Sequence, residues 1–70
     1  MNVYILREHK TKKIQEIVTW CEQQFKDVVR VNSPTIAELH RVSYDNQITG
    51  LIVFYFKEER DYLMFALRWQ

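Results

Sequence analysis

The stretch Gly50-Leu51-Ile52-Val53-Phe54-Tyr55-Phe56 decides how this chain folds, because every residue after the glycine is apolar. A strand with one face in water alternates polar and apolar side chains, and this stretch does not. An unbroken apolar run of this length is typical of a central strand with both faces covered. It predicts that a strand over about residues 48–57 lies in the middle of a small sheet.

The chain is too short to supply a helical layer for each face of that sheet. Its 70 residues make a single domain, 1–70, and a chain of this size buries only about 60% of its unfolded surface. Helices can cover one face, which leaves the other to water or to another molecule. This open face is the main indication of function in the sequence.

Composition excludes several classes of protein. Hydrophobic residues make up 47% of the chain, which is typical of a globular domain, and the net charge of +1 lacks the basic excess of most nucleic-acid binders. The longest uncharged stretch, residues 46–56, is too short to span a membrane. The single Cys21 cannot form an internal disulfide, so we expect a reducing, cytoplasmic location.

Two segments have clear secondary-structure patterns. Residues 2–7 predict a strand in which Val3 and Ile5 share one face while Tyr4 and Leu6 share the other. Thr11 is the expected N-cap of a helix that ends at residues 25–27. Its apolar positions fall on one helical face; they are Ile14, Ile17, Val18, Cys21, Phe25 and Val28.

Two other segments allow both helix and strand. Ser33-Pro34 is a helix-start signal for residues 34–42, but the apolar stripe that follows is thin and a turn signal at residues 45–47 favours a strand. Residues 59–69 fit either period. The connection before them has no tight-turn residue and carries acidic side chains suited to a helix N-terminus, which favours a helix.

These elements predict an α+β fold, a two-layer sandwich with the order β-α-β-β-α. It is close to a ferredoxin-like fold that lacks the last strand, with a further short strand at residues 28–31. The strand at residues 2–7 would lie where the missing strand normally pairs. Its edge would therefore be free to pair with another chain.

We find no catalytic constellation and expect no enzyme activity, metal or cofactor. His9 and His40 have no cysteine or carboxylate at a metal-site spacing, and Cys21 lies on the apolar helix face. The acidic group at residues 58–61 is explained by a helix start. One glycine in the whole chain cannot build a phosphate-binding loop.

The predicted open face gives a hypothesis of protein binding. We expect an apolar patch there that is larger than a soluble monomer usually leaves in water; its members are Tyr4, Leu6, Leu51, Val53 and Tyr55. The partner would be another protein or a second copy of this chain in a homodimer.

The architecture also resembles RNA-recognition modules, which stack bases on strand aromatics. Val3-Tyr4-Ile5 resembles the shorter of their two strand motifs, with Tyr4 at the stacking position, but Leu51 and Val53 replace aromatics of the longer one. This resemblance implies binding of RNA or single-stranded DNA as the second hypothesis. Only Tyr4 is carried over from the resemblance as a stacking position, with Tyr55 and Arg41 as its expected neighbours. The basic residues expected along the path of the nucleic-acid backbone are Arg7, Lys10, Lys12 and Lys13.

The C-terminal segment resembles the ends of many small proteins of large tailed bacteriophages. The pattern Phe-x4-Asp-x3-Phe-x-Leu-Arg-Trp is formed by Phe56, Asp61, Phe65, Leu67, Arg68 and Trp69. The resemblance implies a phage accessory protein that acts on a host protein in the host cytoplasm. It leaves open whether the protein is a virion component or an intracellular factor.

Overall fold

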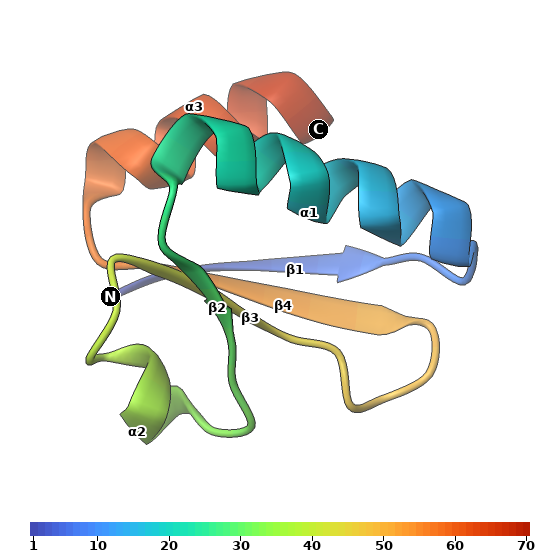
Figure 1. Cartoon of the computed structure of the whole chain (residues 1–70), viewed down its shortest axis with the longest axis horizontal. Coiled ribbons are helices and arrows are strands. Elements are labelled where there is room, and N and C mark those ends of the chain that lie inside the picture. The colour runs from blue at the N-terminus through green and yellow to red at the C-terminus, as the bar shows by residue number, and fades with distance from the viewer.

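The chain folds into a small α+β domain with a four-stranded mixed sheet and three helices (Figure 1). This computed structural model describes all residues, 1–70. The elements, in chain order, are β1 (Asn2–Arg7), α1 (Thr11–Phe25), β2 (Val28–Arg30), α2 (Pro34–Ala37), β3 (Val42–Asp45), β4 (Leu51–Phe56) and α3 (Glu59–Trp69).

The apolar strand β4 lies inside the sheet, as its sequence predicts. The strand order is β1-β4-β3-β2, and β4 runs antiparallel to both of its neighbours, β1 and β3. The short β2 adds a parallel edge beside β3. The short strand expected at residues 28–31 is observed as β2, whereas the expected order β-α-β-β-α lacked α2. The observed strand order does not confirm a ferredoxin-like arrangement.

Helices α1 and α3 lie together on one face of the sheet, while α2 lies on the opposite side (Figure 1). The prediction of a helix over residues 59–69 is confirmed, with acidic Glu59 and Asp61 in its first turn and Arg68 in its last. Helix α1 is also confirmed, but its N-cap is Lys10, and no side chain caps it. The expectation that Thr11 is the cap is therefore wrong by one residue.

The segment at residues 34–42 is neither one helix nor one strand, because the short helix α2 covers 34–37, a turn follows over 38–41 and β3 starts at Val42. The Ser33 Oγ accepts a hydrogen bond from the Ile36 backbone N–H (3.3 Å), and Pro34 begins the helix, as the start signal indicates. The helix ends after four residues, and the strand β3 begins only at Val42.

Helix α1 ends in a strained backbone conformation. Its C-cap, Lys26, has φ 63° and ψ −99°, which a side chain with a Cβ rarely adopts. We expect Lys26→Gly to raise the free energy of unfolding by about 1 kcal/mol, because glycine adopts positive φ without the steric cost. Urea denaturation measures the change. Lys26→Ala removes the same charge but keeps the Cβ, so an equal gain in that variant would contradict the explanation.

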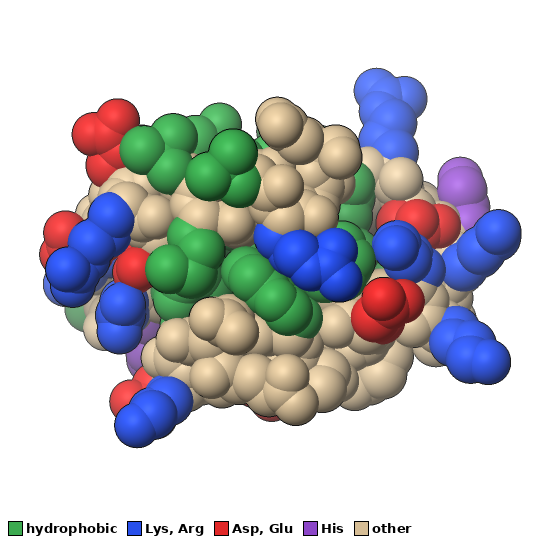
Figure 2. Space-filling view, turned by 90° about the horizontal axis from the view of Figure 1, so that it is seen from above, with side chains coloured by type: hydrophobic (Ala, Val, Ile, Leu, Met, Phe, Trp, Pro, Cys, Tyr) green, Lys and Arg blue, Asp and Glu red, His purple; other side chains and the backbone are tan.

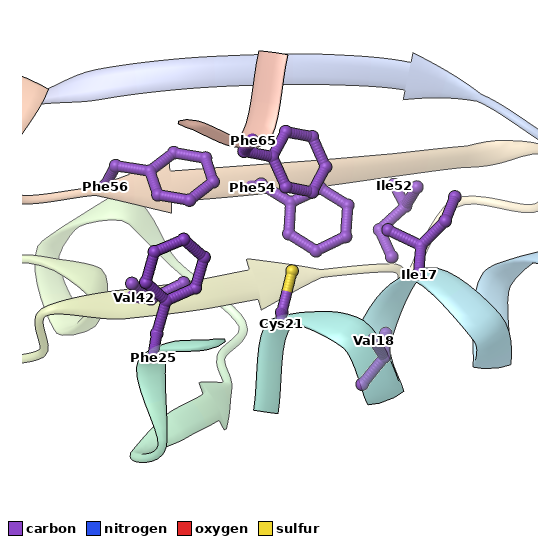
Figure 3. Packing of buried hydrophobic residues seen from close by; sticks show 9 residues of the cluster. All are labelled: Ile17, Val18, Cys21, Phe25, Val42, Ile52, Phe54, Phe56 and Phe65. Carbon is purple, nitrogen blue, oxygen red and sulfur yellow. The ribbon is translucent and has the colours of Figure 1, made fainter. Parts of the chain in front are cut away.

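Aromatic residues dominate the core between the helices and the sheet (Figure 3). Phe65 of α3 is fully buried, and its ring lies 4.6 Å from that of Phe54 and 5.2 Å from that of Phe56, centroid to centroid. The buried cluster consists of Ile17, Val18, Cys21, Phe25, Val42, Ile52, Phe54, Phe56 and Phe65. All strands except β1 and β2, and both long helices, contribute to it.

Cys21 is fully buried in this cluster, and its thiol points into the core (Figure 3). Burial, with a smaller contribution from the charge of Glu22, raises the pKa of the Cys21 thiol to about 12 from its ordinary value of 9.0. The unfolded chain therefore loses this proton at a lower pH than the folded one. The buried thiol thus contributes to the free energy of unfolding in full below pH 9.0, and this contribution is lost as the pH rises toward about 12.

We expect this titration to lower the free energy of unfolding by up to about 1.4 kcal/mol per pH unit within that range. Chemical denaturation at pH steps between 9.0 and 12 measures the slope. Tyrosines and lysines also titrate there, so Cys21→Ala serves as the reference. Parallel pH profiles for the two proteins would contradict the prediction.

Candidate functional site

The sheet face that points away from α1 and α3 carries an apolar strip on β1 and β4. In the antiparallel register, Ile5 pairs with Val53 and Arg7 pairs with Leu51, so these side chains share one face. We define the apolar strip as Val3, Ile5, Leu51 and Val53. Val3 is 44% exposed and Ile5 is 62% exposed, while Leu51 and Val53 are half-buried.

The other half of this face is covered by the chain itself. The segment that contains α2 folds over the sheet and buries Val31, Ala37 and Tyr55 in a second, small cluster, with Val29 and Val53 packed against it. Helix α2 thus shields the β2–β3 side, and only the β1–β4 side stays open. The prediction that the whole face is open is therefore wrong for this half, and the sequence contains no signal for this cover beyond the cap at Ser33.

The expectation that Tyr4 and Leu6 lie on the open face is wrong. Both point toward the helices and pack against the main core, and the Tyr4 ring lies 5.1 Å from that of Phe65. The alternation along β1 was assigned to the wrong face. Arg7 lies on the same face of β1 as Val3 and Ile5. Its charge is the signal in the sequence that this face is in contact with solvent.

The three predicted residues of β4 all lie on the expected face. Leu51 and Val53 line the strip, but Tyr55 is only 8% exposed because it belongs to the cluster beneath α2. Burial, with a smaller contribution from the charge of Asp45, raises the pKa of the Tyr55 hydroxyl. Tyr55 therefore contributes to the structure beside the strip and does not offer a free surface.

The residues proposed for nucleic acid are not brought together on one face. Tyr4 lies beneath the helices and Tyr55 beneath α2, so neither ring is free to stack on a base. The basic residues Arg7, Lys10, Lys12 and Lys13 follow the end of β1 into the start of α1. Figure 2, which looks down on the helical layer, shows acidic side chains interspersed with the basic ones.

Arg41 is held by an ion pair and is not part of that group. Its guanidinium donates hydrogen bonds to both carboxylate oxygens of Asp61, at 2.8 and 3.0 Å. Asp61 is 1% exposed, whereas the Arg41 side chain is 48% exposed. The hydrogen bond and the negative charge of Asp61 raise the pKa of Arg41. The pair joins the start of α3 to the residue before β3.

Gly50 lies at the end of the strip, where the backbone approaches His9 closely. Gly50 has φ 81°, and a Cβ at this position would collide with the imidazole ring of His9. The Gly50 carbonyl accepts a hydrogen bond from the Glu8 backbone N–H (3.0 Å), which extends the pairing of β1 with β4.

The structure shows no group of three or more His, Cys, Asp or Glu side chains that could hold a metal ion. His9 lies beside Gly50 and His40 follows α2 in the chain, so the two histidines occupy separate parts of the fold. No helix has the length and apolar composition needed to cross a membrane.

Comparison with known proteins gives no relative from which a role can be transferred. No protein-family model matches the chain, and neither a curated protein nor a solved structure matches it.

The C-terminal pattern residues mostly hold α3 against the rest of the domain. Phe56 and Phe65 are in the core, Asp61 pairs with Arg41, and the Trp69 ring packs edge-on against that of Trp20 at 5.9 Å. Packing therefore accounts for most of the pattern. Leu67 differs from the other pattern residues, because it is 77% exposed.

Proposed function

We propose that this chain is a small non-catalytic protein-binding module that binds its partner through the apolar strip. The observation that carries the proposal is the exposure of Val3 and Ile5 beside Leu51 and Val53 on one face of the sheet. Exposed apolar patches on small soluble domains commonly mark sites of protein interaction. Burying the strip would remove this apolar surface from water and stabilise a complex.

The border of the strip supports the same proposal. Arg7 lies opposite Leu51 at one end, and Asp45 of β3 lies opposite Val53 on the side away from β1. Protein interfaces commonly have an apolar centre and a polar rim, and the rim fixes orientation while the centre supplies most of the affinity. Charged groups of both signs on this rim favour a partner with mixed charge over a polyanion.

The phage resemblance of the C-terminal segment supports a host protein as the partner and the host cytoplasm as the location. In this proposal the chain is a phage accessory protein that redirects or blocks the protein it binds. We also propose that the fold of this chain is related to the ferredoxin-like fold and lacks the last strand of that fold. The antiparallel β1, β4 and β3 with α1 and α3 support it.

The test of the binding surface is Val53→Lys. We expect at least a tenfold loss of partner binding with the fold retained, because the lysine stem covers its neighbours while its ammonium group prevents an apolar surface from closing over the strip. A photo-crosslinking residue at Leu51 reports binding in cells of the host. Gln23→Lys, which adds the same charge on α1, is the matched control and should crosslink as the unchanged chain does.

Circular dichroism and thermal denaturation show whether Val53→Lys is folded, and Leu51→Lys with the crosslinker at Val53 replaces it if it is not. Failure to capture any protein from Leu51, or capture that is unchanged by the lysine, would refute the proposal. A crosslinked product that nuclease removes would refute it in favour of nucleic-acid binding.

A further inference from the structure

Strand β1 has a free edge, and the direction of its backbone groups can be assigned. The Glu8 N–H donates to the Gly50 carbonyl of the strand segment beside it, so Glu8 faces β4. Backbone groups alternate in direction along an antiparallel strand, so Leu6 and Tyr4 also face β4. The N–H and C=O groups of Val3, Ile5 and Arg7 therefore point outward from the sheet, where β1 has no neighbour.

We infer that this edge pairs with β1 of a second copy of the chain, antiparallel and centred on Tyr4. In that register Val3 of each copy lies opposite Ile5 of the other. Each of these pairs joins outward-facing groups on both strands and can exchange both of its backbone hydrogen bonds. The two sheets then form one continuous sheet across a twofold axis, which is the commonest symmetry of homo-oligomers.

The charges along the edge fit a second copy. No side chain from Asn2 to Leu6 is charged, and Arg7 lies opposite Met1, so no two like-charged side chains oppose each other in this register. Edges that stay unpaired are commonly protected by lysine, proline or a bulge, and β1 has none of these between Asn2 and Leu6. Pairing also places the exposed Val3 and Ile5 of both copies next to each other, which joins the two apolar strips.

The helical layer above the edge also fits a second copy. Helix α3 lies over β1, since Tyr4 contacts both Phe65 and Tyr62. With paired strands about 4.8 Å apart, an α3 seated above β1 and β4 would lie about 10 Å from its symmetry mate, which is a normal distance for packed helices. Tyr62 lies on the β1 side of α3, since its ring is 6.1 Å from that of Tyr4, and the small Ala66, one helical turn further on, permits close approach.

The experiment compares the unchanged chain with Ile5→Pro by sedimentation velocity from micromolar to millimolar concentration. We expect the unchanged chain to reach twice the 8.6 kDa mass of one chain, and Ile5→Pro to stay at the single-chain mass. Proline removes only an outward N–H at this position, so the pairing with β4 is kept. Ile5→Val keeps the N–H and should still form the dimer.

Amide hydrogen exchange gives a second measurement that does not depend on how well the variant folds. In the dimer we expect the Val3 and Ile5 amides to be protected as strongly as those of Tyr4 and Leu6. A single-chain mass at millimolar concentration would overturn the inference, and so would rapid exchange at Val3 and Ile5. A dimer that Ile5→Pro leaves intact would also overturn it, because another surface would then form the contact.

The dimer inference does not rest on the proposed function, and the results of the two experiments can be told apart. A monomer that still crosslinks another protein from Leu51 would overturn the dimer and leave the binding module. A dimer that crosslinks no protein except its own second copy would support the edge pairing and refute an accessory role on a host protein.

Discussion

Phe65→Ala is expected to lower the free energy of unfolding by about 3–5 kcal/mol, the usual cost of removing a buried phenylalanine ring. Phe65 is fully buried, and its ring contacts those of Tyr4, Trp20, Phe54 and Phe56. A 70-residue domain has a total stability of about 4–10 kcal/mol, so the variant would lose a large part of its free energy of unfolding. Urea denaturation followed by tryptophan fluorescence measures the loss.

Leu67→Ala is the matched control for this prediction. It removes an apolar side chain from the same helix two residues later, but Leu67 is 77% exposed. We expect a change within about 0.5 kcal/mol. If the two variants lost similar stability, α3 would not pack on the sheet through Phe65 as described.

Breaking the ion pair between Arg41 and Asp61 is expected to have the second-largest effect, and the two sides of the pair should not be equivalent. Asp61→Asn removes charge-assisted hydrogen bonds at a cost of about 1.5–3 kcal/mol, and Arg41 can then turn to water because it is half-exposed. Arg41→Met should destabilise the fold more, because it leaves the carboxylate of Asp61 buried without a partner.

Thermal denaturation of the two single variants and of Arg41→Met/Asp61→Leu tests this asymmetry. The double variant should recover part of the loss of Arg41→Met, since no buried charge remains. Methionine keeps an apolar stem beside Phe25, over whose ring the Arg41 guanidinium lies at 5.8 Å. A larger loss for Asp61→Asn than for Arg41→Met would show that Asp61 is hydrated in solution.

Elements with a strong internal pattern could be predicted from the sequence. The apolar face of α1 recurs at helical spacing, and the limits of β1 coincide with an apolar run that ends at Arg7. Helix α3 was ambiguous by period, and the acidic first turn together with the lack of a tight-turn residue before it indicated the helix. The interior position of β4 followed from apolar side chains on both of its faces.

The face of β1 could not be read from hydrophobicity, because Val3, Tyr4, Ile5 and Leu6 are all apolar. Which pair is buried depends on the register with β4 and on the aromatic side chains of α3, and these are long-range contacts. The same limit applies to α2. Ser33-Pro34 predicts where the helix α2 starts. That α2 then covers Tyr55 depends on how residues 38–41 lead the chain into β3, and this is not visible in the sequence.

The pairing of β1 with β4 has a consequence for how the protein is made. Tyr4 pairs with Phe54, so a segment synthesised early must wait for one that leaves the ribosome much later. Non-local pairing of this kind slows folding, because loop-closure entropy is lost before the contacts form. Until β4 has been synthesised, β1 has no strand to pair with, so its apolar side chains and backbone edge stay exposed and open to aggregation.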